Sequence, residues 1–260
     1  MTRIALFGGI YSNYRALEVA LRDVEERSVD AVYCLGDLGA FGPYPDRVYP
    51  LLRQGGVECI QGNYDNSLAG GLADCQCGYT DPRDNYFARL SYSYTFQNTS
   101  EGHKAWLRTL PLTRRLLLGD RRVLLCHGSP RKINEFLWDS TSPDSFLEYL
   151  LDYAEADIVC VSHTGIKWRR QLSGSRHFVN VGVLGRPEND GNTHAWYTLL
   201  SIVAKDIEVE FVPVVYDYSG LAADMREGRL PQEFVETITT GWWTTCLEIL
   251  PHKERARGRY

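Results

Sequence analysis

Short apolar runs that end in glycine and polar residues recur along this chain of 260 residues, and they constrain its fold more than any other feature. Apolar residues at helical spacing follow the first of these runs, so the pattern predicts strands that alternate with helices. Such alternation predicts parallel pairing and an α/β fold whose sheet is covered on its faces. The first predicted strands are residues 3–7, 31–35 and 57–60, and the first predicted helices surround residues 17–24 and 46–54.

The rest of the chain predicts an insertion, a second sheet and a tail, within one domain of residues 1–260. Residues 68–110 are less regular and predict a helical insertion beside the functional site. Residues 240–260 predict a C-terminal tail whose charged end, from residue 252, is loose or lies over the surface. The insertion contains predicted helices at residues 86–92 and 101–110, and the later elements are predicted strands at 122–126, 158–161, 178–181, 195–203 and 207–215 and helices at 146–154, 219–227 and 232–237.

Composition excludes several classes of protein. No stretch approaches the roughly 18 apolar residues that cross a bilayer, so we expect no membrane partner. A net charge of −5 without a long basic run argues against binding of duplex nucleic acid. Seven cysteines, an odd number in a chain without a cleavable signal, predict free thiols and a cytoplasmic location. Cys75 and Cys77, with one residue between them, could form a metal or redox site, but a single Cys-x-Cys without a distant partner pair is interpreted as structural or incidental.

Polar side chains follow five of the predicted strands, at the point where each strand ends. Because ligands of open α/β sheets bind at the carboxyl edge of the strands, these segments are expected to converge. Asp37, Asn63, His127 and His163 are among these residues. One carboxylate, one amide oxygen and two imidazoles form a plausible set of four ligands for Zn, Mn or Fe.

The order of these motifs resembles that of the calcineurin-like metallophosphoesterases over most of the chain. The motifs are Gly36-Asp37, Gly62-Asn63-Tyr64-Asp65, His127-Gly128-Ser129-Pro130 and His163-Thr164, and residues 36–43 and 180–187 are similar to the small bacterial phosphodiesterase branch. The resemblance implies an α/β (α+β) fold, a four-layer β-sandwich flanked by helices. It also implies hydrolysis of a phosphate mono- or diester by two metal ions, whose bound hydroxide attacks phosphorus in line.

By this resemblance Asp37 is the carboxylate that bridges the two metals, and Asn63, His127 and His163 complete the second metal site. The first site departs from the family, since three of its four ligands are missing. The opening Asp-x-His of the family is Gly9-Ile10-Tyr11 here, and the last His of its Gly-His-Thr-His is Gly165. Tyr64 stands in place of the family's catalytic His, and Asp65, which orients that His, is present.

Three hypotheses follow from this asymmetry. In the first, one metal is kept, and the hydroxyls of Tyr11 and Tyr64 bind phosphate or act as a weak acid. In the second, a tyrosinate at one of these positions is a further metal ligand, which requires Fe(III) or a comparable Lewis acid. In the third, the protein is a catalytically silent ligand-binding or scaffold module.

The complete second metal site favours retained metal chemistry over decay of the site. We therefore predict a phosphoesterase with one or two divalent or trivalent ions and a small phosphorylated substrate, with a nucleotide as one candidate. Tyr64 and Asp65 are the predicted catalytic residues. The predicted phosphate pocket is lined by Tyr11, Asn13, Tyr64 and Arg186.

Overall fold

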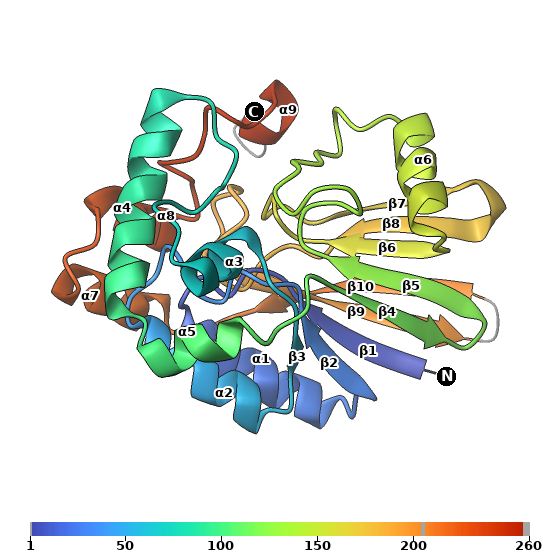
Figure 1. Ribbon diagram of the computed structural model, residues 1–260, viewed down its shortest axis with the longest axis horizontal. Coiled ribbons are helices and arrows are strands. Elements are labelled where there is room, and N and C mark those ends of the chain that lie inside the picture. The colour runs from blue at the N-terminus through green and yellow to red at the C-terminus, as the bar shows by residue number, and fades with distance from the viewer. Residues whose placement is uncertain (1, 204–205, 257–260) are drawn as a thin grey trace.

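The computed structural model describes residues 2–203 and 206–256, and it consists of two stacked five-stranded sheets with helices on their outer faces (Figure 1). One apolar core lies between the two sheets and includes Leu6, Leu125 and Val179. A larger core packs the first sheet against most of the helices, and a third lies under a single helix on the second sheet. The four-layer α/β sandwich expected from the resemblance is confirmed.

The first sheet has the order β10-β9-β1-β2-β3. Its strands are β1 (Thr2–Phe7), β2 (Ala31–Cys34), β3 (Glu58–Cys59), β9 (Ala195–Val203) and β10 (Asp206–Val214). β1 pairs in parallel with β2 and antiparallel with β9. The prediction that the last two strands join a second sheet is wrong, because an apolar run indicates a strand but not its partner. β9 returns to the N-terminal strand instead.

The second sheet has the order β4-β5-β6-β8-β7. Its strands are β4 (Thr113–Leu118), β5 (Arg121–Cys126), β6 (Ile158–Val161), β7 (Trp168–Leu172) and β8 (Arg176–Asn180). The central strands were expected from their apolar runs. The two edge strands, β4 and β7, were not, because paired arginines and mostly exposed or half-exposed side chains weaken the apolar signal in each.

Most helices cover the outer face of the first sheet, whereas α6 covers the second (Figure 1). They are α1 (Tyr14–Glu26), α2 (Val48–Gln54) after a 3₁₀ turn at Pro45–Arg47, α3 (Asn63–Gly70), α4 (Pro82–Asn98), α5 (Glu101–Leu107), α6 (Asp144–Ala154), α7 (Tyr218–Glu227), α8 (Gln232–Thr240) and α9 (His252–Arg255). α4 is longer than predicted, because Asp81 caps it and Pro82 occupies its first turn.

The described part of the tail, up to residue 256, is ordered, whereas a loose tail was one expectation. Glu254 in α9 is buried and accepts a hydrogen bond from the backbone N–H of Ser140 at 2.9 Å. That bond fastens the end of the chain to the loop before α6. Residues 257–260 lie outside the described part. Within residues 2–203 and 206–256, no helix has the length and apolar character needed to cross a membrane.

Candidate metal centre

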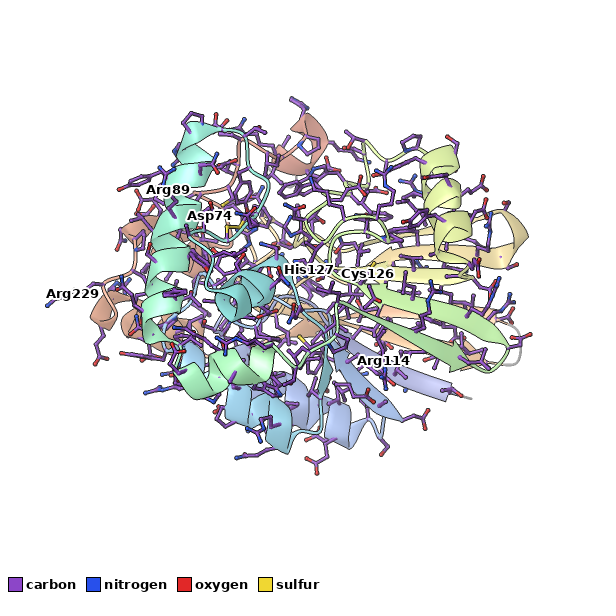
Figure 2. All side chains as sticks on the ribbon, viewed as in Figure 1. Asp74, Arg89, Arg114, Cys126, His127 and Arg229 are labelled. Carbon is purple, nitrogen blue, oxygen red and sulfur yellow. A yellow bond between two sulfur atoms is a disulfide. The ribbon has the colours of Figure 1, made fainter. Side chains whose placement is uncertain are left out.

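The metal ligands predicted from the sequence come from the carboxyl ends of strands in both sheets. Asp37 follows β2, and Asn63 begins α3 shortly after β3. His127 follows β5 directly and lies near the middle of the molecule (Figure 2), and His163 follows β6. We call these four residues the metal centre.

Three of the ligand atoms converge within 4.8 Å of one another, on the buried residues Asp37, His127 and His163. Nε2 of His127 lies 3.3 Å from Oδ2 of Asp37 and 3.1 Å from Nδ1 of His163. Metal–ligand bonds of 2.0–2.2 Å place neighbouring ligand atoms about 3.0–3.5 Å apart. The observed separations therefore match a site that a single cation can fill.

Both histidines are oriented by backbone carbonyls. Nδ1 of His127 donates to the carbonyl oxygen of Leu35 at 2.7 Å, and Nε2 of His163 donates to that of Cys77 at 3.2 Å. Because a carbonyl can only accept, the ring proton is fixed at those nitrogens, and the opposite nitrogens face the centre. Metal-binding histidines in proteins are held in this way.

Asn63 is the predicted fourth ligand, and its amide has one oxygen to offer. Its Nδ2 donates to the carbonyl oxygen of Cys75 at 2.8 Å, whereas its buried Oδ1 has no hydrogen-bond partner. Buried acceptors are rarely left unpartnered, so this oxygen is available for a cation. Two nitrogen and two oxygen ligands fit Zn, Mn or Fe.

Asp65 positions Asp37 rather than lining the cavity. Its carboxylate accepts hydrogen bonds from the backbone N–H groups of Asp37 at 2.6 Å, Gly62 at 2.9 Å and Leu38 at 3.1 Å. Asp37 needs this support because its φ of 56° is in the left-handed region. Asp37 Oδ1 in turn accepts from the backbone N–H of Tyr64 at 3.1 Å, so Oδ2 is left for His127 and a metal.

The centre has a strong internal electrostatic coupling. Burial opposes the charged form of His127, but the Asp37 carboxylate outweighs it and raises the pKa of His127. Burial and then the charge on His127 lower the pKa of His163 to about 3. Burial, followed by the charge on Asp37, raises the pKa of Asp65 to about 7. The buried Asp37 carboxylate therefore favours a proton on the neighbouring His127.

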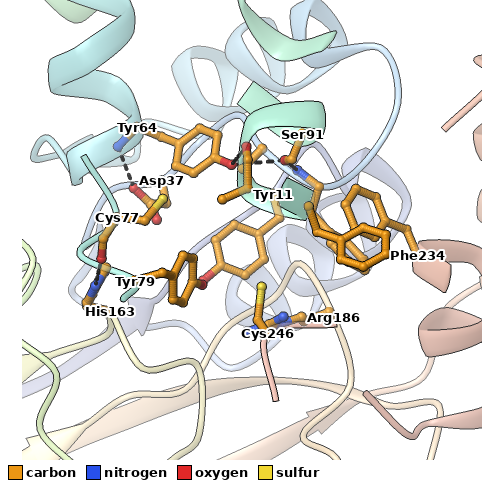
Figure 3. Close-up of a pocket in the computed structure, with 14 residues that line it drawn as sticks. Tyr11, Asp37, Tyr64, Cys77, Tyr79, Ser91, His163, Arg186, Phe234 and Cys246 are labelled. Atoms are coloured by element: carbon orange, nitrogen blue, oxygen red, sulfur yellow. Dashed lines mark hydrogen bonds between the residues drawn. The ribbon is translucent and has the colours of Figure 1, made fainter. Parts of the chain in front are cut away.

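A cavity opens beside Asp37 and His163, and three of the four residues predicted to bind phosphate line it (Figure 3). The Tyr64 hydroxyl donates to Oγ of Ser91 at 3.0 Å. The cavity is lined by Tyr11, Asp37, Ala40, Phe41, Tyr64, Cys77, Tyr79, Phe87, Ala88, Ser91, His163, Arg186, Phe234 and Cys246.

Asn13, the fourth predicted phosphate ligand, does not line this cavity. Its Oδ1 accepts from the backbone N–H of Ala16 at 3.0 Å and caps α1. Its Nδ2 donates to the carbonyl oxygen of Leu184 at 3.2 Å. In this structure Asn13 holds the loop that carries Tyr11 against the loop that carries Arg186.

The prediction of free thiols is wrong for Cys75 and Cys77, which form a disulfide. The disulfide lies in the loop between α3 and α4, where the carbonyl of Cys75 accepts a hydrogen bond from Asn63 and that of Cys77 accepts one from His163. The spacing itself was the only signal in the sequence. Cys246, like the four buried cysteines at positions 34, 59, 126 and 160, is free.

The cavity tyrosines are neutral at physiological pH. Burial raises the pKa of both Tyr11 and Tyr64 above the ordinary phenol value. A tyrosinate ligand at either position would thus need an even stronger Lewis acid than an exposed phenol does. The Tyr64 hydroxyl donates to Oγ of Ser91, whereas the Tyr11 hydroxyl makes no hydrogen bond within residues 2–203 and 206–256.

Comparison with known proteins agrees with the fold and the motifs. Residues 3–204 match the calcineurin-like phosphoesterase superfamily domain. A metallophosphoesterase from Sphaerobacter thermophilus is 25% identical, with 92% of this chain and 99% of that chain covered and a TM-score of 0.69. A hypothetical protein from Pyrococcus horikoshii has the same fold, at 22% identity, coverage of 94% and 100%, and a TM-score of 0.77.

Among curated proteins, an uncharacterized protein of Methanocaldococcus jannaschii is 24% identical over 254 residues, which cover 92% of this chain and 98% of the relative. These proteins therefore match more than nine-tenths of the chain. The family named by the motif order is confirmed by the domain match. The chain belongs to the calcineurin-like phosphoesterase superfamily.

Proposed function

We propose that this protein hydrolyses a phosphate mono- or diester at a single metal ion held by Asp37, Asn63, His127 and His163. The observation that carries the proposal is the geometry of the two histidines. Each gives one ring nitrogen to a backbone carbonyl and turns the other toward Asp37. Membership of a phosphoesterase superfamily supports the reaction class.

In this proposal one set of residues binds the cation and another set binds the substrate. A divalent ion in this centre would polarise a phosphoryl oxygen and lower the pKa of bound water to about 7. Asp65 fixes the backbone of Asp37. Tyr64, whose hydroxyl is oriented by Ser91, and Tyr11 present phenols to the cavity, where a phosphate ester of a small compound would lie.

A second candidate is a phosphoester-binding protein without turnover. The loss of three first-metal ligands favours it, because two-metal enzymes hold both the attacking and the leaving oxygen. The predicted second site argues against it, since both histidines donate one ring N–H to a backbone carbonyl and Oδ1 of Asn63 is buried without a partner. Metal content and turnover separate the two candidates.

The test is elemental analysis together with hydrolysis of an aryl phosphate monoester and diester. We expect about one metal per wild-type chain, and a visible spectrum without a tyrosinate charge-transfer band. His127→Ala and His163→Ala should each lose most of the metal and reduce the rate by a factor of about 100 or more. His177→Ala is the matched control, because His177 is buried in β8 outside the centre.

Full metal content in both ligand variants would show that the metal is bound elsewhere. A wild-type protein with one metal and no turnover on any phosphate ester would favour the binding protein. Stoichiometric iron with a charge-transfer band would favour a tyrosinate ligand.

A further inference from the structure

Of the three positions that lack a first-metal ligand, Tyr11 lines the cavity, and Gly9 and Gly165 each lie next to a residue that lines it. A Cβ atom on Gly9 would lie 2.4 Å from Cε1 of Tyr11, so the Tyr11 ring fills the space of a side chain at position 9. A Cβ atom on Gly165 would lie 3.6 Å from Nη2 of Arg186. The guanidinium group of Arg186 therefore lies beside the space into which a side chain at position 165 would project.

Arg186 is buried without a counter-ion. The residue is 7% exposed, and it forms no ion pair with any carboxylate in residues 2–203 and 206–256. Its Nε is buried with no hydrogen-bond partner. An unpaired buried charge is costly in a folded protein, by several kcal/mol. The position of Arg186 therefore points to an anion from outside the chain.

Stacking keeps the donors of Arg186 available. The guanidinium lies 3.5 Å from the ring centroid of Trp243 and 5.7 Å from that of Tyr11. Because all guanidinium N–H groups lie in its plane, contact between its face and an indole leaves the donor edges free. Trp243 is itself fixed, since its backbone N–H donates to Oδ1 of Asn189 at 2.9 Å.

Tyr11 adds a further donor on the same wall, since its hydroxyl makes no hydrogen bond to the part of the chain that the structure describes. Figure 3 shows Arg186 beside Tyr11 and Cys246 along the cavity. Asp37 and His163, which belong to the metal centre, line the same cavity. One cavity therefore combines a centre for a cation with unsatisfied donors for an anion.

We propose that Arg186, with the hydroxyl of Tyr11, replaces the lost first metal as the positive half of the site and binds a tetrahedral oxyanion. The planar fork of the guanidinium suits two oxygens of a phosphoryl group. That this oxyanion is the phosphoryl group of a substrate rests on the proposed function. The oxyanion site itself is inferred only from the residues that line the cavity. If Arg186 takes the place of the first metal, the protein binds one metal ion rather than two.

The test is calorimetric titration of inorganic phosphate into metal-free wild-type protein, because Arg186 is present whether or not a metal is bound. Arg186→Gln should weaken phosphate binding roughly ten- to hundredfold, since a charged hydrogen bond is lost. Arg186→Lys keeps the charge but not the planar fork of the guanidinium, so its phosphate affinity should lie between those of wild type and Arg186→Gln. Arg83→Gln is the control of equal charge, because Arg83 is exposed outside the cavity.

A crossed measurement separates this inference from the proposed function. His163→Ala should lose the metal but still bind phosphate when metal-free, whereas Arg186→Gln should keep one metal per chain. If wild type takes up no metal but binds phosphate through Arg186, the proposed function fails and the oxyanion site stands. Unchanged phosphate affinity in a folded Arg186→Gln protein, or two metals per wild-type chain, would overturn the inference.

Discussion

At the scale of single residues, His127 lies in the middle of the candidate metal centre, close to both Asp37 and His163. Its Nδ1 proton is committed to the carbonyl oxygen of Leu35, so any second proton must sit on Nε2, between Asp37 and His163. The Asp37 carboxylate favours that second proton and raises the pKa of His127. A metal ion and this proton compete for the same nitrogen.

We therefore predict that metal affinity falls as the pH is lowered through the raised pKa of His127. The loss should begin above pH 6.5, the ordinary value for imidazole, and amount to at most about tenfold per pH unit for one displaced proton. Competition titrations with a metal-sensitive dye between pH 6 and 8 measure it. His177→Ala should show the same dependence of metal affinity on pH as wild type. A metal affinity that does not change between pH 6 and 8 would contradict the assignment of His127 as the residue that exchanges a proton for the metal.

At the scale of elements, the loop between α3 and α4 is the support of the metal centre. The carbonyl of Cys75 accepts from Asn63, and that of Cys77 accepts from His163. Two ligands thus depend on one loop, and the disulfide fixes the separation of the two carbonyls within it.

Replacing both cysteines by serine should weaken metal binding about tenfold, the lower end of the effect of removing groups that orient ligands. Stability should fall by only roughly 1–2 kcal/mol, because the closed loop is very short. Metal titration and urea unfolding measure the two effects. Cys160→Ala, at a buried free cysteine, should leave metal affinity unchanged. If the double serine variant bound metal as tightly as wild type, the disulfide-closed loop would not be needed to orient the ligands of the metal centre.

The same loop shows how far the sequence predicts this site. The order of motifs placed Asp37, His127 and His163 together, because strand ends and their following residues are local features. Nothing local predicts that Cys77 from the insertion and Cys246 from the tail line one cavity, since those contacts depend on how distant segments pack. Local features also identify β9 as a strand without giving its place beside β1. α3 was missed because Gly62 to Asp65 has the composition of a loop.

At the scale of the whole molecule, the metal centre joins the two sheets. Asp37 and Asn63 follow strands of the first sheet, and His127 and His163 follow strands of the second. The described strands of one sheet do not pair with those of the other, and an apolar core separates them. A bound ion would therefore connect both sheets directly.

We predict that metal stabilises the whole fold and not only the site. At a free metal concentration of 100 times Kd, linkage gives about 2.7 kcal/mol. For a chain of this size that corresponds to a rise in Tm of roughly 5–10 °C. Differential scanning calorimetry of chelated and reloaded protein measures it. The shift should vanish in His163→Ala, and an equal shift in that variant would place the stabilising ion elsewhere.

The position of Arg186 changes what the molecule requires from its surroundings. Ions at a metal site exchange with solvent, and abundant or tightly binding metals compete for such a site in the order of their intrinsic affinities. A guanidinium group is covalently part of the chain and charged at every physiological pH. In a protein built this way, only the metal centre can be occupied by the wrong metal. The positive charge of Arg186 is part of the polypeptide and does not depend on the supply of metal ions.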